Sequence, residues 1–119
     1  MFSDYLRDVV HGTDGGFAGL LMGFDGIAVE QYAREDASVD IATVGMEFSH
    51  IISQIRKAAE MLDAGVTREI AIQAEKMTTV VRVLNDEYFL ALALEPTGNV
   101  GKGRYLLRIA APKFLSELE

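Results

Sequence analysis

The segment Gly98-Asn99-Val100-Gly101-Lys102-Gly103 is the part of this sequence that comes nearest to a phosphate-binding loop. A P-loop places four residues between its first glycine and a Gly-Lys pair, and a serine or threonine follows the lysine to bind magnesium. Here Pro96 stands where the first glycine belongs, and Gly103 replaces the hydroxyl residue. We therefore interpret the segment as a glycine-rich helix start with Asn99 as N-cap, and we expect no nucleotide to bind there.

Two histidines and two serines are the other residues whose chemistry needs to be considered. His11 and His50 are far apart in the sequence, and Glu47 lies three residues before His50, where the two side chains could share a helix face. Metal ligands usually occur in closely spaced sets, which these residues do not form. Ser49 and Ser53 flank His50, but no acid that could orient the histidine is identifiable. The sequence predicts a protein without catalytic residues, metal or cofactor.

Composition limits the classes of partner. Half of the 119 residues are hydrophobic, which argues for one folded domain and against disorder. The formal net charge of −7 argues against a broad nucleic-acid-binding surface. The closest basic cluster is spread along one predicted helix and comprises Lys102, Arg104, Arg108 and Lys113.

Targeting signals are also missing from the sequence pattern. The first residues lack the basic and apolar regions of a signal peptide, and no apolar run reaches the length of a membrane span. The chain contains no cysteine, so it has neither disulfides nor thiolate chemistry. We expect a cytoplasmic protein that does not insert into membranes.

The hydrophobic pattern predicts the element order α-β-β-α-β-β-β-α. Helices are expected over 2–11, 40–62 and 99–118, and strands over 17–22, 27–32, 67–75, 78–84 and 87–94. Asp25-Gly26 lies between the first two strands, as in a tight hairpin. Since hairpins rather than crossovers join most strands, we expect an antiparallel sheet with helices on its faces, an α+β fold.

Several residues mark where elements begin, end or bend. Asp40 is the predicted N-cap of the long helix, and Gly65 is the predicted C′ residue after it. Pro112 is expected to kink or break the last helix after Ala110. The strand at 89–94 is apolar on both faces, which places it in the middle of the sheet.

The long helix carries an unusually broad apolar face. One stripe has the alternating spacing of three and four residues of a coiled-coil seam, and comprises Ile41, Val44, Phe48, Ile51, Ile55, Ala58 and Leu62. Beside it runs a second row, Gly45, Ile52 and Ala59. Such a face is wide enough to contact both its own sheet and a partner, although a helix that only covers its sheet would show a similar pattern.

Polar and adaptable residues on the same helix form a candidate partner surface. The set lies off the main stripe and consists of Met46, Ser49, His50, Ser53 and Arg56. Exposed methionine is common at adaptable binding surfaces, and scattered surface residues are the alternative explanation.

Taken together, the element order and two segments resemble the roadblock/dynein light chain family. The segments are the hairpin Leu21-Met22-Gly23-Phe24-Asp25-Gly26-Ile27-Ala28-Val29 and the helix start Gly101-Lys102-Gly103-Arg104-Tyr105-Leu106-Leu107-Arg108. The resemblance covers nearly the whole chain. Within the family it is similar to the small bacterial mutual gliding proteins, and more to their adaptor type, protein C, than to their GTPase-activating type, protein B.

The resemblance implies a five-stranded antiparallel sheet with one long helix on one face and two helices on the other. It also implies a homodimer that joins the third strand and the long helix of two copies. In this sequence the interface would contain Glu69, Ile70, Ala71, Ile72, Gln73 and Glu75 of the strand and Gly45, Ile52 and Ala59 of the helix.

The function implied by the resemblance is that of a non-enzymatic adaptor or regulator. Its partners would be a second copy of itself and another roadblock protein, a Ras-like GTPase or a response-regulator-type polarity factor. A direct GTPase-activating protein is the first alternative. A small-molecule sensor domain is the second, and it requires a pocket with convergent polar groups.

Overall fold

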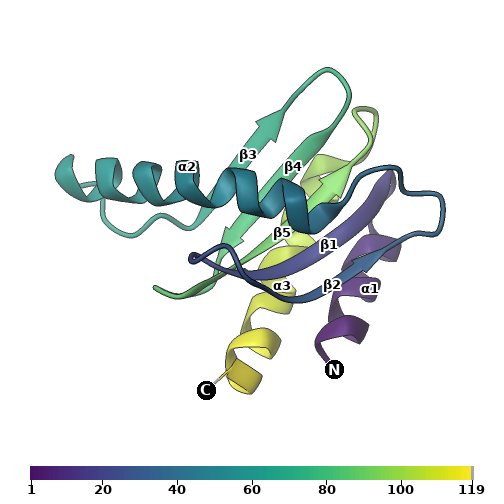
Figure 1. Ribbon diagram of the computed structural model, residues 1–119, viewed down its shortest axis with the longest axis horizontal. Coiled ribbons are helices and arrows are strands. Elements are labelled where there is room, and N and C mark those ends of the chain that lie inside the picture. The colour runs from purple at the N-terminus through teal and green to yellow at the C-terminus, as the bar shows by residue number, and fades with distance from the viewer. Residues whose placement is uncertain (119) are drawn as a thin grey trace.

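The computed structural model describes residues 1–118, and its elements follow the expected order. They are α1 Phe2–Gly12, β1 Gly16–Gly23, β2 Ala28–Ala33, α2 Ile41–Met61, β3 Glu69–Gln73, β4 Thr78–Val83, β5 Tyr88–Leu94 and α3 Val100–Leu118 (Figure 1). The strands form one antiparallel sheet in the order β2-β1-β5-β4-β3, which confirms the predicted fold class and the central place of β5. In the part of the chain that the structure describes, no helix has the length and apolarity needed to span a membrane.

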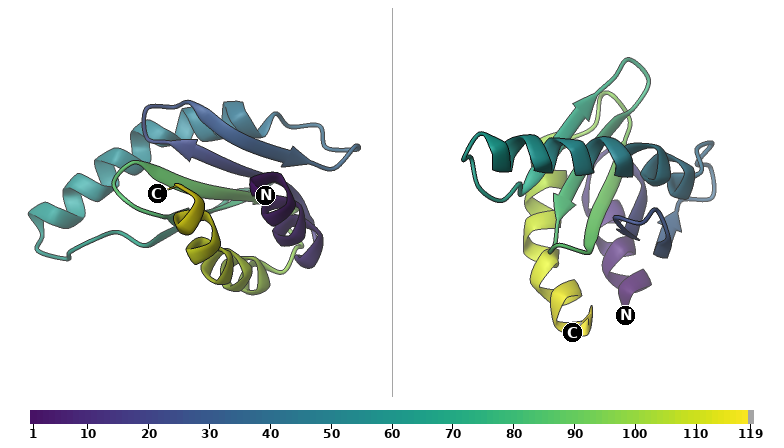
Figure 2. Two further views of the ribbon diagram at one scale, coloured as in Figure 1. Left: turned by 90° about the horizontal axis from the view of Figure 1, so that it is seen from below. Right: turned by 60° about the vertical axis from the view of Figure 1, so that its left-hand side comes forward.

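The sheet separates two apolar layers, because side chains alternate between its faces. Helices α1 and α3 cover one face and α2 crosses the other (Figure 2). Leu90 and Leu92 of β5 belong to the layer under α1 and α3, whereas Phe89 and Ala91 belong to the layer under α2. This alternation explains why β5 is apolar on both faces.

Helix α2 contacts its sheet mainly through a row beside the heptad stripe, and the stripe residues Val44 and Phe48 pack at the margin of this contact. Its buried residues are Ile41, Gly45, Ser49 and Ile52. The stripe shares only its first residue, Ile41, with this row, and its later residues Ile51, Ile55 and Leu62 are exposed. Gly45 and Ser49 in the buried row allow the helix to approach the strands closely, and the later part of the stripe, from Ile51 onward, lies on the exposed flank.

The ends of the helices follow the capping rules with two corrections. Asp40 is the N-cap of α2, as predicted, and its side chain accepts a hydrogen bond from Ala42 N at 3.2 Å. Asp63 rather than Gly65 adopts the left-handed conformation directly after the C-cap of α2, with φ 56°. The predicted break at Pro112 is wrong, since α3 continues through it with the proline ring on the exposed side.

Strand β3 is shorter than expected and forms one edge of the sheet. The predicted strand reached from 67 to 75, but the ladder spans Glu69 to Gln73, and Glu75 lies in the turn that leads to β4. Among the described residues 1–118, one side of β3 therefore has no neighbouring strand. An open edge of this kind favours pairing with another chain.

We predict that Gly45→Val lowers the free energy of unfolding by about 1–3 kcal/mol, because extra volume in a packed core forces its neighbours to move. A Cβ at Gly45 would overlap Leu20 Cδ2 and come within 3.0 Å of Met22 Sδ. Urea denaturation of both proteins measures the change. Gly101→Ala is the control, since the nearest atom to its Cβ is 3.7 Å away and alanine favours a helix. Equal loss of stability in the two variants would contradict the close packing inferred at Gly45.

Candidate interaction surfaces

The glycine-rich segment before α3 is a helix cap in the structure. The Asn99 side-chain oxygen accepts a hydrogen bond from Lys102 N at 3.0 Å, which confirms Asn99 as the N-cap. Gly103 is buried, and a Cβ there would come within 2.8 Å of Leu92 Cδ2. Its lack of a side chain is therefore explained by packing on the sheet.

The histidines and serines do not assemble into a reactive site. His11 on α1 is hydrogen bonded to the Tyr32 hydroxyl group at 2.5 Å, and His50 lies on α2 at the other face of the sheet. Ser49 is buried, and its hydroxyl group donates to the Met46 carbonyl oxygen at 2.8 Å. Among residues 1–118, no group of three or more histidine and carboxylate side chains is placed to hold a metal ion.

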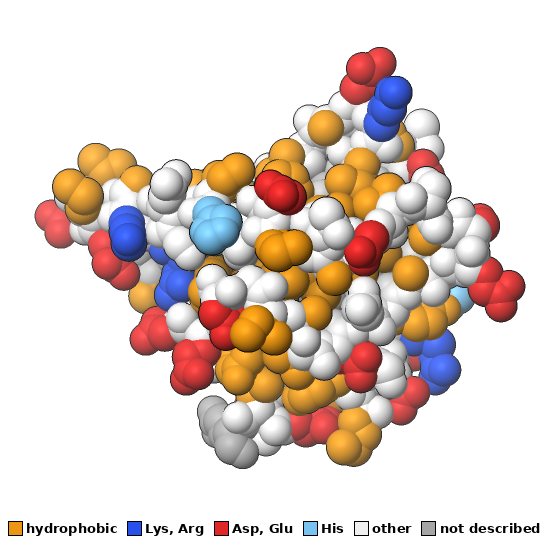
Figure 3. Space-filling model, viewed as in Figure 1, with side chains coloured by type: hydrophobic (Ala, Val, Ile, Leu, Met, Phe, Trp, Pro, Cys, Tyr) orange, Lys and Arg blue, Asp and Glu red, His pale blue; other side chains and the backbone are white. Residues whose placement is uncertain are grey.

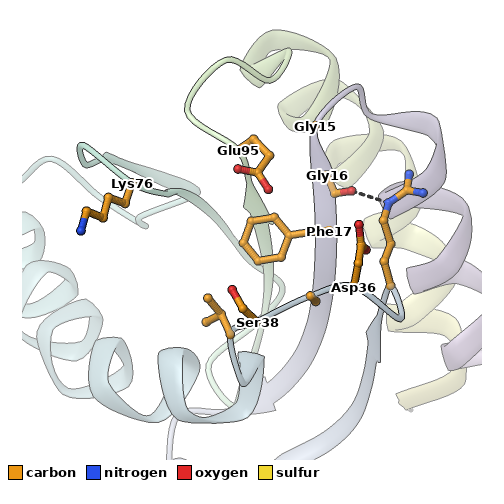
Figure 4. Close-up of a pocket in the computed structure, with 10 residues that line it drawn as sticks. Gly15, Gly16, Phe17, Asp36, Ser38, Lys76 and Glu95 are labelled. Carbon is orange, nitrogen blue, oxygen red and sulfur yellow. Dashed lines mark hydrogen bonds between the residues drawn. The ribbon is translucent and has the colours of Figure 1, made fainter.

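A pocket of about 290 Å³ lies between the start of β1, the loop before α2 and the end of β5 (Figure 4). The Arg34 Nε atom donates to the Gly16 carbonyl oxygen at 2.7 Å at its rim. Phe17 lies in the middle of the hollow, while the Lys76 side chain is directed away from it (Figure 4). An aromatic ring thus occupies the middle of the hollow, and the Arg34 Nε atom is already hydrogen bonded to the backbone, so we do not favour the small-molecule sensor interpretation.

The first candidate surface is the seam surface, defined as Ile51, Ile55, Ala58 and Leu62 of α2 together with Ile70 and Ile72 of β3. Leu62 is 79%, Ile51 50% and Ile55 39% exposed. Ile70 lies opposite Val81 in the β3–β4 ladder, and both pack in the layer under α2. The helix stripe and the strand residues therefore share one side of the sheet. Figure 3 shows hydrophobic side chains gathered along α2 and in the hollow between it and the β3–β4 hairpin.

The seam surface corrects part of the predicted dimer interface. Gly45 and Ile52 are buried against their own sheet and cannot form a surface contact, and Ala59 is half-buried. The periodicity placed both rows on one broad face but did not reveal which row the sheet would cover. In contrast, the expected strand residues of β3 are at least partly exposed.

The second candidate surface is the hairpin surface, defined as Met46, His50 and Ser53 of α2 together with Ile27 of the β1–β2 hairpin. A Cβ on Gly26 would lie 3.8 Å from Met46 Cγ, so the tip of the hairpin adjoins this flank of the helix. Ile27 is 65% and Met46 48% exposed. Sequence reasoning missed Ile27, although an apolar residue directly after a tight turn is a signal for an exposed tip.

Two residues predicted for partner binding have other roles in the structure. Ser49 is buried, so it cannot contact a partner. The guanidinium group of Arg56 lies 4.1 Å above the Phe24 ring, and its Nη2 atom is 3.4 Å from Asp86 Oδ1. Arg56 therefore holds the hairpin against α2, a contact of the cation–π type.

Basic residues of α3 form cation–π contacts and an ion pair with neighbouring side chains. Lys102 and Arg108 flank the Tyr105 ring at 5.7 and 5.5 Å. Arg104 donates to Glu69 Oε2 through Nε at 2.8 Å and Nη2 at 2.6 Å, and this hydrogen bonding raises the pKa of Arg104. The Arg104–Glu69 contact connects α3 to the strand that contributes to the seam surface, since Glu69 is the first residue of β3.

Solved structures of other proteins match the fold of this chain. MglC from Myxococcus xanthus is 40% identical, with 98% of each chain covered and a TM-score of 0.71. A roadblock/LC7 domain from Streptomyces avermitilis has a TM-score of 0.85 at 14% identity, with 98% of this chain and 96% of that chain covered. MglB with a tetrameric arrangement has a TM-score of 0.81 at 20% identity over 91% of this chain and 80% of that chain. Neither a scan of protein-family models nor a search of curated proteins found a match.

The similarity to MglC extends over nearly the full length of both chains, whereas the other two likenesses concern the fold alone. The element order, the sheet topology and the placement of the helices agree with the fold that the roadblock resemblance implied. This chain therefore belongs to the roadblock/LC7 family and resembles MglC more than MglB.

Proposed function

We propose that this protein is a non-enzymatic, cytoplasmic homodimer that acts as an adaptor in a Ras-like GTPase polarity or motility module. The observation that carries the proposal is the seam surface, where large apolar side chains on α2 lie on the same side of the sheet as the open edge β3. A second copy with the same surface would cover the apolar side chains and pair the edge. Dimerisation through these two elements is also what the family resemblance implies.

An adaptor also needs a surface for a partner other than its second copy, and the hairpin surface is our candidate for it. It lies on the other flank of α2, so dimerisation through the seam surface leaves it accessible. The similarity to MglC supports the context of a GTPase module, and the partners we propose are another roadblock protein, the GTPase or a response-regulator-type polarity factor. A direct GTPase-activating protein is the alternative within the same context.

The proposed partner surface is tested by capture from cytosol of the source cell, with wild-type protein and a Met46→Glu/Ile27→Glu variant as parallel baits. Mass spectrometry should identify a roadblock protein or a Ras-like GTPase that the variant does not retain. Gln54→Glu/Lys57→Gln lowers the net charge by the same two units on exposed positions of α2 and serves as the control. Retention of every partner by the hairpin-surface variant would place docking elsewhere.

We further predict that the chain binds neither GTP nor ATP, because the segment before α3 lacks the first glycine and the hydroxyl residue of a P-loop. Isothermal titration of magnesium nucleotide into the protein should give only the heat of dilution. A small Ras-like GTPase titrated under the same conditions is the positive control. Binding in the micromolar range would contradict the prediction.

A further inference from the structure

A pocket of about 80 Å³ lies between α1 and α3, on the face of the sheet opposite α2 (Figure 2). It is lined mainly by apolar side chains, with one acid and one base among them: Tyr5, Asp8 and Val9 of α1 and Leu106, Ile109 and Lys113 of α3. Ile109 is 43% exposed, so the fold of the single chain leaves the pocket open. Both surfaces described above include α2, and this pocket is separate from them.

A row of α3 that runs along the pocket has a lysine at each end and apolar residues between them. Lys102, Leu106, Ile109 and Lys113 are spaced by four, three and four residues, so they share one face of the helix. The two lysines are roughly 17 Å apart along the helix axis, at 1.5 Å per residue. Arg104 points to another side of α3, where it reaches the edge strand β3.

The two lysines of this row are not neutralised by acids of the protein itself. Both are exposed, and within residues 1–118 neither forms an ion pair. Glu117 is the acid of α3, and its hydrogen bonding to Tyr5 raises the pKa of the Tyr5 hydroxyl group. Helix α3 thus carries an excess of positive charge on a chain whose formal net charge is −7. A local surface of this sign favours an acidic partner.

The backbone of α1 and α3 limits the conformation of such a partner. Both elements use their N–H and C=O groups within the helix, so the pocket offers side chains and no open backbone edge. An extended segment bound there would leave its own backbone groups without partners from this protein. A helix satisfies its backbone internally and can place an apolar stripe in a groove between two helices.

We propose that the pocket between α1 and α3 docks an acidic amphipathic helix of another protein. Two apolar residues of that helix would enter the pocket, and carboxylates on either side of them would pair with Lys102 and Lys113. The matching pattern is acid, apolar, apolar, acid at spacings of four, three and four residues, which is the same in both chain directions. None of α1, α2 and α3 has two acids eleven positions apart, so a second copy of this chain does not supply the pattern.

An alanine-rich peptide with a fluorescent label tests the charge pattern. The probe has glutamate at its first and twelfth positions and leucine at its fifth and eighth, and a matched peptide has lysine in place of both glutamates. Fluorescence anisotropy at low salt should show that the acidic peptide binds at least about tenfold more tightly than the lysine peptide. Lys102→Glu/Lys113→Glu should reverse this preference. Lys57→Glu/Lys76→Glu makes the same change of charge at exposed positions elsewhere and should preserve it.

Ile109→Asn separates docking in the pocket from general attraction between charges, because it leaves the net charge unchanged. We expect it to weaken binding of the acidic peptide about tenfold, since it removes apolar contact area. Asp8→Asn should strengthen binding, because it removes a negative charge beside the pocket. Circular dichroism establishes that each variant is folded.

Two results would overturn the proposal. One is a wild-type protein that binds both peptides equally or neither of them. The other is a preference for the acidic peptide that Lys102→Glu/Lys113→Glu leaves unchanged. Vesicles containing phosphatidylserine are tested in parallel, and binding to them without binding to the acidic peptide would assign the surface to an anionic membrane instead. The test requires neither the homodimer nor the hairpin surface, so its outcome is independent of the proposed function.

Discussion

Replacing Ile51 and Ile55 together with glutamate should convert the protein from a dimer into a folded monomer. Both side chains belong to the seam surface and are exposed in the single chain, so the fold itself does not depend on their burial. In the dimer, however, each glutamate would place a carboxylate without a partner in an apolar interface. Burying such a charge costs several kcal/mol, so we expect the dissociation constant to rise by about 100-fold or more.

Light scattering coupled to size exclusion measures this change directly. The wild-type protein should have about twice the chain mass of 13.0 kDa, and the double variant should have the mass of one chain. Gln54→Glu/Lys57→Gln again supplies a matched change of charge, and it should remain dimeric. Circular dichroism establishes that all three proteins are folded. A wild-type monomer at every concentration would refute the homodimer, and a dimeric double variant would remove these two residues from its interface.

Local signals predicted most of the fold because they act over a few residues. Asp40 and Asn99 accept backbone hydrogen bonds at the starts of their helices, as their residue types and positions suggested. The doubly apolar pattern at 89–94 led to the central strand, since only a strand covered on both faces is apolar throughout. These inferences needed no knowledge of distant contacts.

The predictions that failed depended on which side of an element meets its neighbour. Two adjacent rows of α2 are apolar, and periodicity alone does not say which row faces the sheet. Gly45 was the available clue, because a glycine within a helix often marks close approach to another element. At Pro112 the sequence shows that the backbone N–H donor is missing. It does not show that the proline ring lies on the solvent side of α3, where the helix tolerates it.

The candidate surfaces were predictable only in part for the same reason. Met46 and His50 are exposed as expected, because they lie off both apolar rows of the helix. The inward direction of Ser49 and the contact of Arg56 with Phe24 and Asp86 depend on the hairpin that folds against α2. Sequence periodicity contains no information on that long-range contact.

The second major prediction concerns GTP hydrolysis by the cognate Ras-like GTPase. An adaptor should leave the single-turnover rate within about twofold of the intrinsic rate, whereas an arginine finger supplied in trans raises it by about 10³–10⁵-fold. Arg56, the arginine beside the hairpin surface, is held between the Phe24 ring and Asp86. These contacts hold Arg56 against the hairpin, so we expect that it does not act as an arginine finger.

The assay compares the GTPase alone with the GTPase plus wild-type protein, Arg56→Ala or Met46→Glu/Ile27→Glu. We expect all four rates to agree, while capture experiments show that only the last variant loses its partner. This combination would separate docking from catalysis, because binding would depend on the hairpin surface and hydrolysis would not. Acceleration by several orders of magnitude that Arg56→Ala abolishes would instead establish a direct activator. Acceleration that survives Arg56→Ala but not the hairpin-surface change would indicate that docking repositions the GTPase's own catalytic residues.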